Sequence, residues 1–127
     1  MDIVSLYTSI PHKDGLQALA HYLVISNLKN LHIPTILRLA ELVLSLNSFN
    51  FEDRHYQQTK GVAMGTKMGP SFACLFVGFV EEQAMGQYTG IKPFLFKRYI
   101  DDCLGVTTGP KEDLMNFIRH RLSLIHI

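Results

Sequence analysis

The segment from Phe94 to Val106 constrains the fold of this chain more than any other. Two apolar runs, rich in residues that favour β-strands, flank a pair of adjacent carboxylates, Asp101 and Asp102. This pattern predicts a β-hairpin with both acids at or beside its tip. Alternation along the first strand predicts two faces, one with Phe94, Phe96 and Ile100, and the other with Leu95, Tyr99 and Asp101.

The carboxylates of Asp101 and Asp102 repel each other, and burial of either one without a partner would favour its protonation. A nearby cation removes this cost. Mg²⁺ binds hard oxygen ligands, commonly one or two carboxylates together with substrate phosphates, so it is the expected cofactor of such a pair. The alternative is a solvated Asp-Asp turn between two core strands with no chemical role. The hairpin alone does not separate these two interpretations.

The composition sets broad limits on size and partners. The chain has 127 residues, which fits one small domain or a piece of a larger one. Its hydrophobic content of 47% is enough for a core, and its charged content of 18% is low, as if some surface meets a neighbour. The net charge of +1 gives no overall basic field, so contacts with nucleic acid must come from local clusters.

Three further features concern the class of protein. Cys74 and Cys103 form no CxxC pair, which favours a reduced intracellular protein with two core thiols. The six histidines show no zinc-ligand spacing. The longest apolar run is too short to cross a membrane, so no membrane contact is expected.

Hydrophobic periodicity and turn residues predict the order of the elements. They indicate a strand over residues 1–7, helices beginning near 13 and 34, a hairpin over 48–58, a glycine-rich loop over 59–69, a helix from Pro70 whose apolar stripe ends at Glu81 and Glu82, a loop over 86–90, the hairpin of 94–106, and a helix after Gly109-Pro110. This order is an α+β layout in which a small antiparallel sheet is backed by helices on one face. It places Asp2 and Asp101 at strand ends that could lie side by side.

Three segments occur in an informative order: Asp2 to Pro11 (DIVSLYTSIP), Gly61 to Pro70 (GVAMGTKMGP) and Arg98 to Asp102 (RYIDD). Together they resemble motifs A, B and C of the palm domain of reverse transcriptases, in the form found in Penelope-like retroelements, which are relatives of telomerase. One short motif is weak evidence, whereas three in order over nearly the whole chain are specific. The chain departs from many reverse transcriptases in motif B, with Met64-Gly65 and Gly69-Pro70 where those enzymes carry Gln-Gly and Ser-Pro.

The resemblance implies RNA-directed DNA polymerase activity, in which two Mg²⁺ ions, or Mn²⁺, assist nucleotidyl transfer from a dNTP to a primer 3′-hydroxyl. Asp2 and Asp101 match the family's two metal-ligand aspartates, with the backbone carbonyl of Ile3 as a further ligand. Asp102 and Tyr99 complete the third motif, Asp102 as a further catalytic acid and metal ligand that is less critical, and Tyr99 as a substrate-binding residue. Without the other motifs, Asp2 would be interpreted as a strand-end or cap aspartate.

The resemblance also implies residues that contact the nucleotide. Tyr7 matches the aromatic steric gate that crowds the 2′ position of the sugar and so selects dNTPs. The alternative for Tyr7 is a core tyrosine. The segment that lies along the incoming nucleotide and the template base comprises Gly65, Thr66, Gly69 and Pro70. The alternative for those glycines is a turn that caps the helix beginning at Pro70.

On this resemblance, residues 1–127 are a partial reverse transcriptase domain that spans motifs A to C, without fingers, thumb or endonuclease. Expected partners are an RNA template, a DNA primer and a dNTP, at an intracellular and nuclear location. Two alternatives stay open: an inactive retroelement remnant with at most weak nucleic-acid or protein binding, and an unrelated magnesium phosphoesterase, which would need neither Tyr7 nor the motif B glycines. The chain alone is expected to polymerise nothing, because positioning the primer and the triphosphate needs fingers and thumb.

Overall fold

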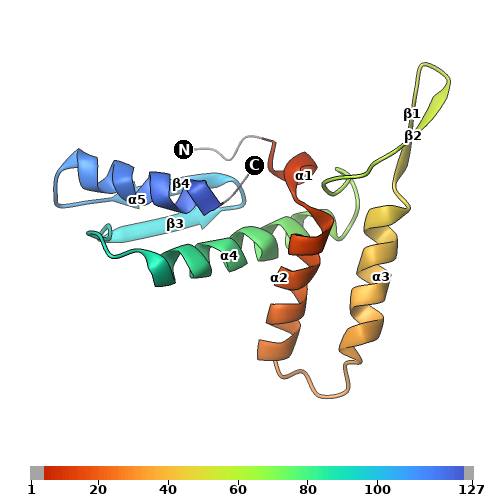
Figure 1. Cartoon of the computed structure of the whole chain (residues 1–127), viewed down its shortest axis with the longest axis horizontal. Helices are drawn as coiled ribbons and strands as arrows, with labels where there is room; N and C mark the ends of the chain where they lie inside the picture. The colour runs from red at the N-terminus through yellow and green to blue at the C-terminus, as the bar shows by residue number, and fades with distance from the viewer. Residues whose placement is uncertain (1–4, 125–127) are drawn as a thin grey trace. The chain divides into compact units, whose positions relative to one another are not determined.

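The computed structural model describes the backbone of residues 5–124 as a mixed α+β structure (Figure 1). Within this range there are five helices: α1 Leu6–Ser9, α2 His12–Ile25, α3 Ile33–Ser45, α4 Gly69–Gln87 and α5 Lys111–Leu124. The same range holds four strands: β1 Ser48–Phe51, β2 Arg54–Gln57, β3 Leu95–Tyr99 and β4 Asp102–Val106. They form two separate antiparallel hairpins, β1–β2 and β3–β4. The predicted α+β class is therefore confirmed, whereas the prediction of one small sheet is wrong.

The chain divides into two compact units, an N-terminal unit over Ser5–Phe76 and a C-terminal unit that begins at Val77, within α4. In the N-terminal unit, α2 and α3 run antiparallel side by side (Figure 1). Gly15 lets α2 approach the start of α4 closely, because a Cβ at this position would lie 2.4 Å from Cζ of Phe72. Its buried apolar core comprises Leu6, Ile10, Ala18, Ala40, Leu44, Val62, Phe72, Ala73 and Phe76.

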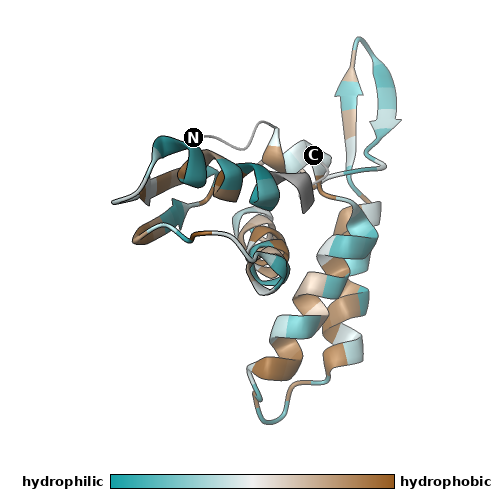
Figure 2. Cartoon of the chain, turned by 60° about the vertical axis from the view of Figure 1, so that its left-hand side comes forward, coloured by the Kyte–Doolittle hydropathy of each residue, from teal (hydrophilic) through white to brown (hydrophobic). Residues whose placement is uncertain are grey.

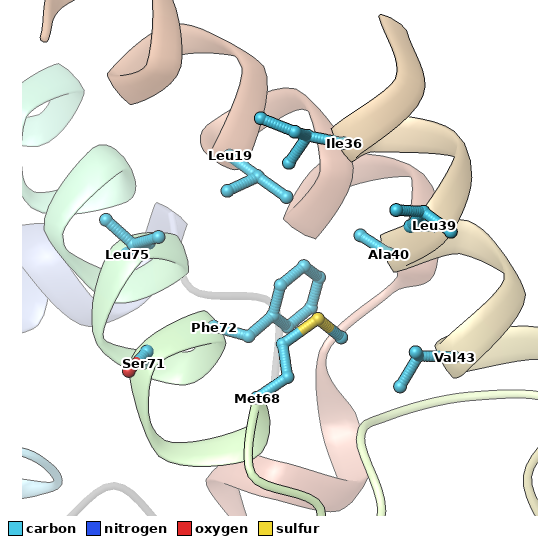
Figure 3. Close-up of a pocket in the computed structure, with 9 residues that line it drawn as sticks. All are labelled: Leu19, Ile36, Leu39, Ala40, Val43, Met68, Ser71, Phe72 and Leu75. Carbon is cyan, nitrogen blue, oxygen red and sulfur yellow. The ribbon is translucent and has the colours of Figure 1, made fainter. Parts of the chain in front are cut away.

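An apolar cavity of about 300 Å³ lies in this unit, where side chains converge from α2, α3 and the start of α4 (Figure 3). Its lining consists of Leu19, Ile36, Leu39, Ala40, Val43, Met68, Ser71, Phe72 and Leu75. Exposed apolar surface continues to the brown end of α2 in Figure 2, where Val24 and Ile25 are exposed. The helices of the N-terminal unit are therefore incompletely packed.

The β1–β2 hairpin follows α3 and confirms the hairpin predicted over residues 48–58. Phe51 pairs with Arg54, so the turn consists of two residues, Glu52 and Asp53. Their φ angles of 48° and 60° are both positive, as a type I′ turn requires. Every residue of both strands is exposed, and the hairpin's own ring stack of Phe49 on Tyr56, at 5.5 Å between centroids, contributes to its pairing.

The C-terminal unit packs one face of the β3–β4 hairpin against helices. Along both strands, exposed residues alternate with half-buried ones. On the covered face, the Phe96 ring meets the Phe117 ring of α5 edge to face at 5.4 Å. Gly105 permits this approach, because a Cβ there would lie 3.0 Å from Cδ1 of Leu114. The helix predicted after Gly109-Pro110 is confirmed as α5.

Two local predictions are wrong. The expected strand over residues 1–7 does not reach its end, because the backbone N–H and the side-chain hydroxyl of Thr8 both donate to the Ser5 carbonyl and close the turn that begins α1. The loop expected over residues 86–90 is shorter, because α4 continues to Gln87. Ala84 is fully buried, so core packing continues beyond the apolar stripe that the sequence shows.

Candidate active site

The tip of the β3–β4 hairpin carries the carboxylate pair. Tyr99 pairs with Asp102, which leaves Ile100 and Asp101 as a two-residue turn. Asp101 is half-buried in the turn, and Asp102 begins β4 on the exposed face. The prediction that both acids lie at or beside the tip is confirmed. The predicted alternation is wrong beyond Tyr99, because Ile100 and Asp101 belong to the turn and not to the strand.

The backbone of the turn is unusual at Ile100. Its φ is 55°, whereas Asp101 does not share the positive φ. A positive φ at the first turn position alone is the pattern of a type II′ turn, which normally places glycine there. A β-branched residue in this region is an outlier that costs about 1–3 kcal/mol and persists only when surrounding contacts hold it.

Arg98 makes contacts that hold this turn. Its Nη1 donates to the Ile100 carbonyl at 2.8 Å, and its Nε donates to Oε1 of Glu81 on α4 at 2.9 Å. The same Oε1 accepts from Nη2 of Arg121 on α5 at 2.5 Å. Charge-assisted hydrogen bonds of this kind are stronger than neutral ones. The Arg98–Glu81–Arg121 network therefore ties the strained turn to both helices.

Burial strengthens this network. The side chains of Arg98, Glu81 and Arg121 are only 13%, 17% and 10% exposed. The Arg121 guanidinium also lies over the Phe96 ring, 4.1 Å from its centroid, which is within the range of a cation–π contact. Two guanidiniums share one carboxylate, so the network carries a net positive charge on the covered side of the hairpin that bears the aspartates.

Cys103 lies beside this network and stays a neutral thiol. Burial raises the pKa of Cys103 above its ordinary value, and the Glu81 carboxylate raises it further, against opposing effects of Arg121 and Arg98. Its Sγ lies 4.0 Å from the Asp101 carbonyl, a weak hydrogen bond that only the protonated thiol donates. Burial thus disfavours the thiolate form of Cys103, which lies behind the turn.

A shallow recess of about 320 Å³ lies at the hairpin and is lined by Lys97, Arg98, Tyr99, Asp102, Cys103 and Leu104. Lys97, Tyr99, Asp102 and Leu104 belong to its exposed face, whereas Arg98 and Cys103 are half-buried. Tyr99 is 78% exposed and Leu104 is 62% exposed. An ammonium group, an aromatic ring and a carboxylate thus share one open surface. Such a surface suits a ligand that carries both phosphates and flat rings.

The motif B segment is organised in the N-terminal unit. Gly65 has a φ of +100° and open space around it, so its backbone is accessible. The Thr66 hydroxyl donates to the Ala63 carbonyl at 3.0 Å, and the Gly69 N–H donates to the Thr66 carbonyl at 3.0 Å. Gly69 and Pro70 begin α4, so the capping interpretation of this turn and a substrate contact at Gly65 are compatible.

The gate candidate Tyr7 lies in α1 and is half-buried. Its carbonyl accepts from the N–H of Val62 at 2.6 Å, and the Gly61 carbonyl lies 2.7 Å from Nε2 of His12. The sequence patterns indicate a functional role for neither His12 nor Glu81. Each acts through a partner far along the chain, which periodicity does not reveal.

The sequence-predicted residues separate into three groups. Asp2 and Ile3 lie outside the described residues, so convergence of the Asp2 and Asp101 carboxylates stays a prediction. The N-terminal unit holds five, namely Tyr7, Gly65, Thr66, Gly69 and Pro70. The C-terminal unit brings Tyr99, Asp101 and Asp102 together at one hairpin tip.

The fit of this tip to a divalent cation follows from its donors. Two adjacent carboxylates suit Mg²⁺, which takes one or two carboxylates and completes its shell with water and phosphate. Over residues 5–124 there is no group of three or more His, Cys, Asp or Glu side chains able to hold a metal ion. A magnesium site at Asp101 and Asp102, completed by oxygens from Asp2 and a triphosphate, stays a prediction.

No helix in the described part of the chain is long and apolar enough to cross a membrane. Cys74 and Cys103, which both lie within the described residues, are not joined by a disulfide bond. Comparison with protein-family models, curated proteins and solved structures gives no match to this chain.

Proposed function

We propose that this chain is the palm core of an RNA-directed DNA polymerase of the Penelope-like kind. The support is the order of the three motifs together with the architecture around two of them. An acidic pair lies at a hairpin tip, and a glycine-rich segment lies beside the candidate gate. The substrates would be an RNA template, a DNA primer and a dNTP.

The observation that carries the proposal is the turn at Ile100. A strained, β-branched turn residue directly before a carboxylate pair is expected where the position of the carboxylates matters. Arg98 spans from that turn to Glu81, so the backbone that carries the pair is held before any ligand binds. Such preorganisation is what a site for transferring charged groups requires.

Each acidic residue would have its own role at the metal site. Asp101, with Asp2 and the Ile3 carbonyl, would hold the metal ions, and Asp102 would add negative charge beside them. When bound, the two ions supply charge neutralisation and orientation at the entering and leaving oxygens. The 3′-hydroxyl of the primer would attack the α-phosphate of the dNTP beside these aspartates. The new phosphodiester bond would form as the bond to pyrophosphate breaks and pyrophosphate leaves.

Sugar selection would depend on Tyr7. A ring next to the 2′ position excludes a ribose hydroxyl by its bulk. Tyr7→Ala should therefore admit ribonucleotides, whereas Tyr7→Phe should behave like the unchanged protein. Incorporation of dNTPs and rNTPs, measured separately, tests this. Equal discrimination by both variants would make Tyr7 a core residue.

The decisive experiment compares two aspartates in equivalent places. In a protein that carries residues 1–127 together with fingers and thumb subdomains, Asp101→Asn should reduce primer extension on an RNA template by about a thousandfold, since a metal-ligand charge supplies several kcal/mol. Asp53→Asn is the matched control, because Asp53 occupies the same second position in the turn of the other hairpin. Similar rates for the two variants would show that Asp101 has no catalytic role.

A second candidate, an inactive relative that only binds nucleic acid, is favoured by the open recess with Lys97 and Tyr99. It predicts binding without extension. In that case Lys97→Ala would weaken binding of single-stranded RNA, with a strong dependence on salt, and Asp101→Asn would not. Templated extension that is lost on Asp101→Asn would exclude this candidate.

A further inference from the structure

Three hydrogen bonds join residues 7–12, which run from α1 to the start of α2, to the start of the motif B segment. The N–H of Val62 donates to the Tyr7 carbonyl at 2.6 Å, and the N–H of Gly61 donates to the Ile10 carbonyl at 2.9 Å. In addition, Nε2 of His12 lies 2.7 Å from the Gly61 carbonyl. Two segments about fifty residues apart thus form one backbone contact.

This contact requires glycine at position 61. The φ of Gly61 is +78°, a conformation that L side chains rarely adopt. A Cβ would also lie 2.5 Å from the Tyr7 oxygen and 2.5 Å from the carbonyl carbon of Thr8. Both of these are backbone atoms and cannot rotate away. The close approach is therefore a specific feature of the fold.

His12 provides the side-chain part of the contact. It is the first residue of α2 and is half-buried. A carbonyl oxygen only accepts hydrogen bonds, so Nε2 of His12 carries the hydrogen. Gly61 itself is buried, and a buried carbonyl needs a partner. His12 supplies one from outside the loop.

We propose that His12 is a positioning residue that holds the loop of residues 61–66 against the backbone of Tyr7. On the proposed function, on which this role in substrate choice rests, the loop contributes Gly65 to the nucleotide and Tyr7 contributes the gate. His12 touches neither sugar nor phosphate. It acts by fixing the gate and the loop relative to each other, and so sharpens the choice of sugar.

The first arm of the test needs no polymerase activity. Hydrogen exchange on residues 1–127 should show the Gly61 and Val62 amides exchanging about fivefold faster in His12→Ala, the loss expected for one buried hydrogen bond. His12→Gln keeps an N–H donor and should restore protection. His55→Ala is the matched control, because His55 is exposed on β2. Phe72 lies in α4, and its amide donates to the Met68 carbonyl. The exchange rate of this amide should not change in any variant.

Equal protection of Gly61 and Val62 in all variants would overturn the proposal. So would a parallel rise at Phe72, since His12 would then stabilise the whole unit and not the loop. This arm stands whether or not the chain belongs to a polymerase.

The second arm uses the protein that carries fingers and thumb. His12→Ala should lower discrimination between dNTP and rNTP about fivefold while leaving the rate with dNTP within twofold, and His12→Gln should recover it. Unchanged discrimination in an active enzyme would overturn the positioning role. A complete lack of templated extension in the unchanged protein would count against the proposed function instead, and the exchange arm would still decide the contact itself.

Discussion

The two hairpins of this protein look alike in sequence and differ in what surrounds them. Each has a two-residue turn, and each has two acidic residues at its tip, Glu52 and Asp53 in one and Asp101 and Asp102 in the other. The β1–β2 hairpin is exposed along its whole length. The β3–β4 hairpin is covered on one face, and its turn is held through Arg98. An acidic pair at a tip is therefore not a site by itself, and the contacts behind it distinguish the two.

The two hairpins also differ in the backbone conformation of their turns. In β1–β2 both turn residues adopt the positive φ that a type I′ turn needs, and neither Glu52 nor Asp53 is β-branched. In β3–β4 a β-branched residue, Ile100, takes the position that suits glycine, and this costs more. The first turn persists on a fully exposed hairpin, whereas the second is held by contacts of Arg98.

The largest expected effect on stability concerns Glu81. Glu81→Gln should lower the free energy of unfolding by about 3 kcal/mol, because two largely buried guanidiniums lose their shared carboxylate. Glu41→Gln is the matched control, since its pair with Arg38 leaves these side chains 50% and 67% exposed, and it should cost less than about 0.5 kcal/mol. Urea unfolding of residues 1–127 measures both. Equal losses of unfolding free energy in the two variants would show that the Glu81 network stabilises the protein no more than an exposed ion pair does.

A smaller effect is expected at the turns. Ile100→Gly should raise the free energy of unfolding by about 1 kcal/mol, because glycine removes the strain of the positive φ. Glu52→Gly, at the first position of the β1–β2 turn, should raise it by less, because Glu52 also has a positive φ but is not β-branched. If the strained turn serves the carboxylates, primer extension should fall with Ile100→Gly although the protein becomes more stable. A stability loss at Ile100 would show that its burial outweighs the strain.

The smallest effect concerns alkaline pH. The folded state raises the pKa of Cys103 above the ordinary 9.0, chiefly by burial. Its contribution to stability is therefore complete below the unfolded pKa and is lost as pH rises through the folded value. The free energy of unfolding should decline above pH 9.0, and Cys103→Ala should make this decline shallower. An unchanged slope would show that the thiol does not ionise differently in the two states.

Much of the local structure was predictable from sequence. Turn residues and β-prone runs located both hairpins, and prolines located the starts of α3, α4 and α5. These features are encoded by neighbouring residues. The number of sheets was not predictable, because a strand's periodicity shows which residues alternate and does not show which strand it pairs with.

The candidate site was predictable only in part. The position of Asp101 and Asp102 at a tip followed from the hairpin pattern, and the structure confirms it. The supporting contacts did not follow. Glu81 resembles the polar end of an apolar helix stripe, and only the folded chain brings Arg98 and Arg121 to its carboxylate. Long-range ion pairs leave no periodic trace in a single sequence.

The apolar cavity between α2, α3 and the start of α4 is open to solvent, since Leu39 and Val43 in its lining are 57% and 41% exposed. This open apolar surface has a consequence for the heat capacity. Apolar surface that already contacts water in the folded state adds nothing to the heat-capacity increase on unfolding. That increase should therefore be smaller per residue in this protein than in a domain that buries the same side chains.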